Sequence, residues 1–136
     1  MVRSLDGVTF APTGDQAPGQ VGTETRFSYH QDGDRVWAEY AGGDVVMGFL
    51  IGTRAQDTLD FRYVQLRRDG TTATGRCMSL LSETSDGRLR SDESWQWESE
   101  QGSGTSTVEE LPQPGERPGR RTGAAGAGGD GATATG

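Results

Sequence analysis

The stretch that decides the fold is residues 23–52, with the sequence TETRFSYHQDGDRVWAEYAGGDVVMGFLIG. Its first part alternates bulky and polar side chains with a period of two, which is typical of a strand with one buried face. The dipeptide Asp32-Gly33 follows, and Asp-Gly tolerates the positive φ angles of a two-residue hairpin turn. We therefore predict a hairpin with this dipeptide at its tip, in which the apolar face pairs Gln31 with Asp34, Tyr29 with Val36, Phe27 with Ala38 and Thr25 with Tyr40. The polar face then pairs His30 with Arg35, Ser28 with Trp37 and Arg26 with Glu39.

The turn after this hairpin leaves the register of the next strand open. A two-residue turn at Gly42-Gly43 and a three-residue turn over residues 41–43 both suit the sequence. We prefer the three-residue turn because it keeps Tyr40, Val46 and Leu50 on the core face. The outward face then carries a stripe of large apolar side chains, and such patches usually mark contact sites. We predict a homodimer through this stripe, which consists of Trp37, Val45, Met47, Phe49 and Ile51.

The rest of the chain continues with short strands and Gly-containing turns, and no segment shows helical periodicity. The further predicted strands are residues 8–11, 45–54, 59–67, 71–83, 89–98 and 105–111. Consecutive hairpins form a meander, and eight antiparallel strands are enough to close a barrel and remove unpaired edges. We predict an all-β fold, an eight-stranded antiparallel up-and-down β-barrel of the lipocalin or avidin type. A two-sheet sandwich is the main alternative.

The C-terminal part differs sharply in composition from this barrel. Residues 112–136 contain no aromatic and no large aliphatic side chain, so they cannot bury enough apolar surface to offset their conformational entropy. The sequence thus predicts a barrel domain over residues 1–111 and a disordered tail over residues 112–136. The whole chain has a net charge of −7. The tail carries a net charge of +1, so the barrel domain carries −8. A body with a charge of −8 argues against binding to nucleic acid or to anionic membranes.

Sulfur and imidazole ligands are scarce. Cys77 is the only cysteine and His30 the only histidine, so no internal disulfide and no Cys-based metal site is expected. No cofactor motif stands in the foldable region, and no residue set identifies a reaction. The N-terminus has no apolar run of signal-peptide length, which predicts a soluble cytoplasmic protein.

The best candidate site is the inner face of the predicted barrel. Rings on that face are suited to line a pocket for a flat or apolar ligand, although in a domain of this size they also suffice to fill the core. Glu93 shares the face, and a carboxylate among aromatic rings has a raised pKa suited to proton transfer. The favoured alternative for Glu93 is a place near the rim or an ion pair with an arginine of a neighbouring strand. The candidate ligand-binding residues are Tyr29, Tyr40, Tyr63, Glu93, Trp95 and Trp97.

Several short runs resemble a known family. YHQDGDRVWAEYAGG, LDFRY, TGRC and ESWQWESEQGSGTSTVEE are similar to segments of small single-domain bacterial all-β proteins that often carry the label N-acetylglutamate synthase. The resemblance spans roughly residues 27–110 and implies a small all-β domain, with no catalytic residues to carry over. It also makes an acetyl-CoA-dependent N-acetyltransferase the alternative to a binding module for a small ligand or a protein partner.

The acetyltransferase alternative requires a pyrophosphate-binding loop at a helix N-terminus, where backbone N–H groups are free to donate. Residues 120–125, RRTGAA, match the Arg/Gln-x-x-Gly-x-Gly/Ala form of that loop. They lie in the low-complexity tail, with no predicted strand before them and no amphipathic helix after them. The sequence therefore favours a binding module over this enzyme.

Overall fold

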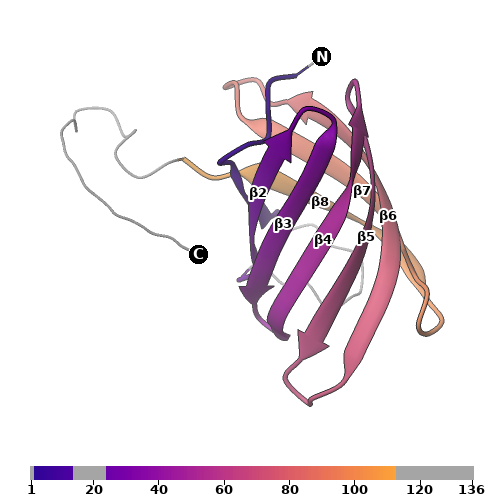
Figure 1. The fold of residues 1–136 in the computed structure, drawn as a ribbon. Helices are drawn as coiled ribbons and strands as arrows, with labels where there is room; N and C mark the ends of the chain where they lie inside the picture. The colour runs from indigo at the N-terminus through magenta and orange to yellow at the C-terminus, as the bar shows by residue number, and fades with distance from the viewer. Residues whose placement is uncertain (1, 14–23, 113–136) are drawn as a thin grey trace.

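The structure is a computed structural model, and it describes residues 2–13 and 24–112. Within these residues the strands follow one another in chain order around a closed antiparallel barrel, in which β1 also pairs with β8 (Figure 1). The predicted up-and-down barrel is therefore confirmed, and the sandwich is excluded. The predicted tail, apart from Pro112, lies outside the described residues. The strands are β1 (Thr9–Pro12), β2 (Arg26–Asp32), β3 (Arg35–Gly42), β4 (Val45–Ala55), β5 (Thr58–Arg67), β6 (Thr72–Glu83), β7 (Leu89–Trp97) and β8 (Ser103–Glu110).

The register of the β2–β3 hairpin differs from the prediction by two residues. Asp32 pairs with Arg35, so the turn consists of residues 33–34, and Gly33 with a φ of 64° takes its first central position. Glycine at that position is typical of a type II′ turn. The shift is even and therefore leaves every side chain on its predicted face. The observed pairs along the hairpin include Phe27 with Tyr40, Ser28 with Glu39, Tyr29 with Ala38, His30 with Trp37 and Gln31 with Val36.

The β3–β4 connection also differs from both predicted turns. Gly42 pairs with Val45, so the turn is again of two residues, and the ladder is irregular on both sides of it. One irregularity lies between Val45 and Met47, where Val46 is the extra residue of a bulge. As a result Val45 is buried and Val46 is exposed, the reverse of the prediction, whereas Leu50 points inward as expected.

The N-terminal segment covers one end of the barrel, the end at which the β2–β3 and β4–β5 turns lie (Figure 1). Leu5 is completely buried there, and its backbone N–H donates to Oε1 of Gln31 at 3.0 Å. The buried guanidinium of Arg54 donates to the same oxygen at 3.1 Å and to the carbonyl of Arg3 at 2.8 Å. It also donates to the carbonyl of Val2. These hydrogen bonds provide acceptors for the buried Arg54 guanidinium and join it to the N-terminal segment.

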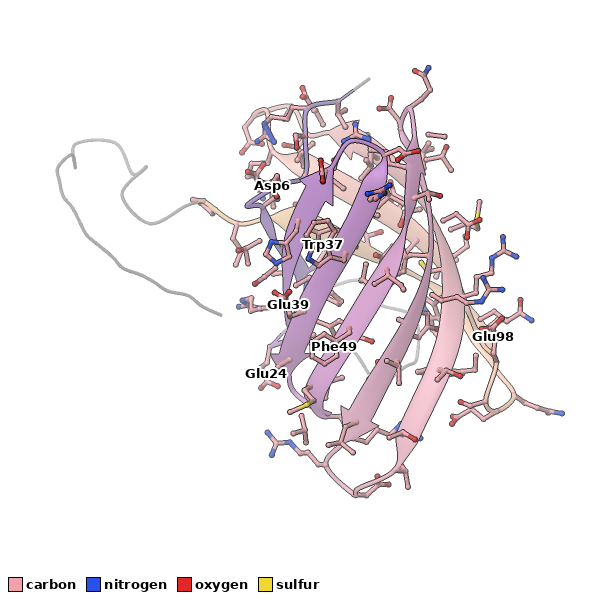
Figure 2. The ribbon with its side chains drawn as sticks, viewed as in Figure 1. Asp6, Glu24, Trp37, Glu39, Phe49 and Glu98 are labelled. Carbon is pink, nitrogen blue, oxygen red and sulfur yellow. The ribbon has the colours of Figure 1, made fainter. Side chains whose placement is uncertain are left out.

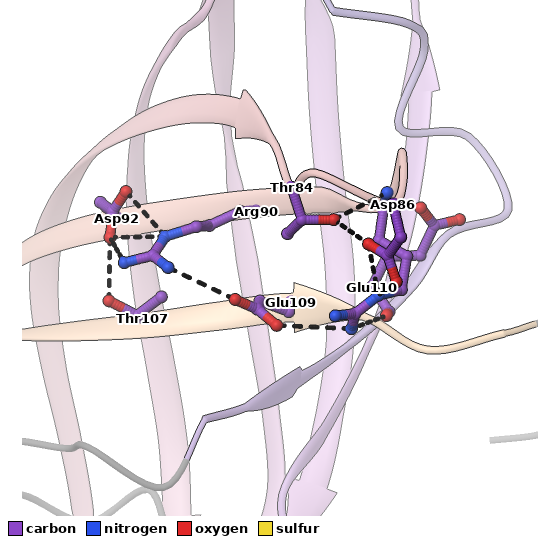
Figure 3. A network of polar contacts seen from close by, with 8 residues as sticks. Thr84, Asp86, Arg90, Asp92, Thr107, Glu109 and Glu110 are labelled. Atoms are coloured by element: carbon purple, nitrogen blue, oxygen red, sulfur yellow. Dashed lines mark hydrogen bonds and ion pairs between the residues drawn. The ribbon is translucent and has the colours of Figure 1, made fainter.

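The outer surface over β7 and β8 is polar and internally paired (Figure 3). Arg90 bridges Asp92 at 3.1 Å and Glu109 at 3.4 Å, and Arg88 reaches Glu109 at 3.3 Å. Hydrogen bonding to Arg90 lowers the pKa of the Asp92 carboxyl below its usual value. Each exposed ion pair of this kind contributes little to the free energy of unfolding. The outer surface over β7 and β8 is therefore chiefly a hydrated face.

The outer surface over β3, β4 and β5 is different. Trp37 and Phe49 stand on the outside of β3 and β4 (Figure 2). Trp37 pairs across the ladder with Ile51, and Phe49 pairs with Val64. We call this surface the apolar face; its residues, with their exposed fractions, are Trp37 (38%), Met47 (50%), Phe49 (49%), Ile51 (68%) and Val64 (43%). The predicted outward stripe is confirmed except for Val45.

Candidate functional site

The inner side of β5 and β7 carries a row of partly buried rings near the end of the barrel opposite the N-terminal segment. Trp97 is the last residue of β7, and its ring centre lies 5.8 Å from that of Trp95 and 5.5 Å from that of Tyr63. Gly104 and Gly75 stand opposite these rings, and a Cβ at either position would lie within 2.6 Å of a ring atom. The two glycines therefore make room for rings to lie flat against the barrel wall.

Three buried side-chain atoms lack a hydrogen-bond partner among the described residues: the Tyr29 hydroxyl, Nε2 of Gln65 and Nε of Arg67. The Tyr40 hydroxyl donates to Oε1 of Gln65 at 2.9 Å, yet Nε2 of the same amide is buried with no hydrogen bond among the described residues. The hydroxyl of Tyr29 is equally buried and unpaired within that part of the chain. Leaving a buried polar atom unsatisfied costs about 1–3 kcal/mol. Such atoms are therefore expected to meet a ligand or ordered water.

A carboxylate shares this interior. Glu93 is partly buried on the inner face of β7, and its Oε1 accepts a hydrogen bond from the Ser106 hydroxyl of β8 at 2.8 Å. Burial raises the pKa of the Glu93 carboxyl to about 7, and the charge of Asp92 adds to the rise. The hydrogen bond from Ser106 acts in the opposite direction and lowers this pKa. The expected arginine partner for Glu93 is not observed in the described part of the chain. At neutral pH this carboxyl is therefore partly protonated.

The carboxylate lies within electrostatic reach of the inner phenols and the thiol. Burial raises the pKa of Tyr29, Tyr40, Tyr63 and Cys77, and the charge of Glu93 raises each of them further. All four groups therefore stay neutral at physiological pH. The phenols remain hydrogen-bonding groups, and the thiol is not a nucleophile.

The structure thus brings all six sequence-predicted residues to the barrel interior, and their role in binding stays a prediction. Sequence reasoning missed Gln65 and Ser106. Gln65 continues the inward alternation of Phe61 and Tyr63 along β5. A polar residue in a row of inward-pointing side chains could therefore have identified it from the sequence. Ser106 becomes a partner of Glu93 only through the β7–β8 register, which pairs the two directly.

Among residues 2–13 and 24–112, no group of three or more His, Cys, Asp or Glu side chains is placed to hold an ion. The same residues include no helix long and apolar enough to cross a membrane.

Comparison with known proteins agrees with the geometry. The family model described as avidin-like protein matches residues 3–111. The chain belongs to the avidin-like protein family. This match covers the whole described barrel, whereas no curated protein and no solved structure matches the chain. The all-β part of the resemblance is thus confirmed as avidin-like, and the description of the matching family does not include the N-acetylglutamate synthase label. The string at residues 120–125 lies outside the described residues. An avidin-like barrel suggests a ligand-binding module.

Proposed function

We propose that this protein is a binding module that holds one small apolar or aromatic ligand inside the barrel. The proposed contacts are Tyr29, Tyr40, Tyr63, Glu93, Trp95 and Trp97, with the Gln65 amide as a further donor. An eight-stranded barrel has an interior of the right size for one small ligand or a filling of side chains. The match to the avidin-like family supports an interior that holds a small ligand.

One observation carries the proposal: the Tyr29 hydroxyl is buried and has no hydrogen-bond partner in the described part of the chain. Tyrosine retained in a core normally has a partner for its hydroxyl, because phenylalanine would otherwise pack there without the desolvation cost. The Gln65 amide nitrogen shows the same feature on the inner face of β5. A ligand with polar atoms facing both groups would remove two desolvation penalties at once.

Tryptophan fluorescence tests the proposal directly. The chain has three tryptophans, and a Trp37→Phe variant leaves only the two inside the barrel as reporters. We would titrate this variant with 2-phenylethylamine, 2-phenylethanol and phenylacetate, which share one ring and chain length but differ in polar group. At least one probe is expected to give a saturable change with a Kd of about 1 mM or tighter, which suits ligands of this size.

A matched control locates the signal. The double variant Trp95→Phe with Trp97→Phe keeps aromatic rings at both positions but leaves Trp37 as the only reporter. Calorimetric binding should persist in this variant while the fluorescence change disappears. Failure of all three probes to bind, or a fluorescence change that survives in the double variant, would overturn the interior site.

The apolar face supports a second proposal, that two copies of the chain pair through it. Its residues carry no charge, and Trp37 stacks on His30 with ring centres 5.4 Å apart, which fixes the ring against the sheet. A net charge of −7 disfavours association through the acidic parts of the surface, whereas an uncharged patch is complementary to itself under two-fold symmetry. A second copy is therefore the partner that this face suits best.

A further inference from the structure

We infer that the ligand of this barrel is an organic cation, an amine on an apolar or aromatic body, with its nitrogen held between the Glu93 carboxylate and the Tyr29 hydroxyl. The inference rests on the proposed function, because it names the class of ligand for the same interior site. It follows from three observations: the groups around Glu93, the rings beside it and the charge of the chain.

The first observation is that Glu93 has no cationic partner among the described residues. From its own strand the nearest charge is Asp92, and from β8 the Ser106 hydroxyl donates to it. The titratable groups of β2, β3, β5 and β6 on which its charge acts are neutral, namely Tyr29, Tyr40, Tyr63 and Cys77. Its partner across the ladder on β6 is Ser79, which is also neutral. Buried carboxylates are normally paired with a cation, and none of the described residues supplies one here. A ligand with a positive charge would complete the pair.

The second observation concerns the aromatic rings. The faces of tryptophan and tyrosine attract cations, and cages of such rings recognise substituted ammonium groups. Arg67 already uses this property, since its guanidinium carbon lies 5.4 Å from the centre of the Trp97 ring. The same arginine forms an ion pair with Glu100 at 2.9 Å, and its Nε is buried without a hydrogen-bond partner among the described residues. The Tyr29 oxygen offers lone pairs for a second ammonium N–H.

The third observation is the charge of the whole molecule. The chain has a net charge of −7, and its negative potential raises the local concentration of cations. A carboxylate ligand would meet this potential and a second negative charge inside the barrel. An amine therefore gains from both the long-range field and the local pair.

The three probes that differ only in polar group test this inference. At pH 8, 2-phenylethylamine is expected to bind about 10- to 100-fold more tightly than 2-phenylethanol, as a charge-assisted hydrogen bond of about 1.5–3 kcal/mol implies. Phenylacetate is expected to bind most weakly. Between pH 8 and pH 5.5 the amine should lose about tenfold or more in affinity as Glu93 is protonated, while the alcohol should change little.

Two isosteric variants separate the possible outcomes. Glu93→Gln should remove the preference for the amine while 2-phenylethanol still binds, and Asp92→Asn, with the same change of charge on the outer side of β7, should keep it. Equal or tighter binding of the alcohol or the acid in the wild-type protein would overturn the amine assignment and leave the binding function intact. The same assignment fails if Glu93→Gln retains the preference. Failure of all three probes to bind the wild-type protein would instead overturn the proposed function.

Discussion

The ring of Tyr40 lies directly over Gly48, its partner across the β3–β4 ladder. A Cβ at residue 48 would stand 2.4 Å from the ring carbon Cζ, so only glycine leaves space for the ring in this orientation. The ring also stacks on Phe27 with centres 4.8 Å apart, and its hydroxyl donates to Gln65. One glycine thus sets the position of a phenol that orients the inner amide.

Replacing Gly48 with alanine should destabilise the barrel. The Tyr40 ring is buried between Phe27 and the β4 backbone, so it has little room to move, and overpacking of this kind costs about 1–3 kcal/mol. Urea unfolding gives the free energy difference. Gln96→Ala on the exposed side of β7 is the control and should change stability by less than about 0.5 kcal/mol. Equal stability of Gly48→Ala and the wild-type protein would show that the ring is not confined.

Glu93 should make the stability depend on pH. Its folded-state pKa of about 7 lies above the ordinary value, so the folded protein holds this proton more tightly than the unfolded chain. The stabilisation is therefore complete below about pH 4.5 and is lost as the pH rises to about 7, at roughly 1.4 kcal/mol for each unit of pKa shift. The stability of the wild-type protein relative to Glu93→Gln should accordingly fall by about 3 kcal/mol between pH 4.5 and pH 8. A constant difference would mean that Glu93 titrates normally.

Arg54 should tie the N-terminal segment to the barrel. Its buried guanidinium satisfies the carbonyls of Val2, Arg3 and Gln56, and a methionine would fill its volume without replacing those bonds. Arg54→Met is therefore expected to cost about 2–4 kcal/mol and to expose the segment to proteolysis. Arg62→Met, at an exposed arginine of the neighbouring strand, is the matched control. Unchanged cleavage near residues 2–5 in Arg54→Met would show that other contacts hold the segment.

The apolar face should control self-association. The double variant Met47→Glu with Phe49→Glu places two charges on exposed positions of β4, so it should remain folded but become a monomer by light scattering. Ser94→Glu with Gln96→Glu adds the same charge on the exposed side of β7 and should leave the dimer intact. A wild-type protein that is already monomeric, or a dimer that survives the first pair of changes, would contradict the proposed pairing.

The barrel could be predicted from the sequence because the period-two patterns and Gly-containing turns agreed along most of the chain. The strand β7 is the clearest case, since the inward set of Leu89, Ser91 and Trp95 follows from alternation alone. What alternation does not determine is the exact residues of a turn. Gly33 and Gly43 occupy the first position of their two-residue turns rather than the last. Which position the glycine takes depends on how the two flanking strands twist together.

The bulge at Val46 shows the main physical limit of sequence reasoning here. β4 is apolar on both faces, so its pattern carries no information on which side is buried, and one extra residue exchanges the roles of Val45 and Val46. The inward positions of the rings and of Glu93 were predicted more fully, because these residues lie on strands with a clear pattern. The pairing of Glu93 with Ser106 and the unpaired Tyr29 hydroxyl depend on three-dimensional packing, which one sequence does not contain.

The most direct test of the central claim is a crystal structure of the protein grown with 2-phenylethylamine near pH 8. The account predicts electron density for the amine inside the barrel, with its nitrogen within hydrogen-bond distance of the Glu93 carboxylate and the Tyr29 hydroxyl and its ring against Trp95. An interior closed by side chains, with the Tyr29 hydroxyl bonded to the protein itself and no amine present, would contradict it.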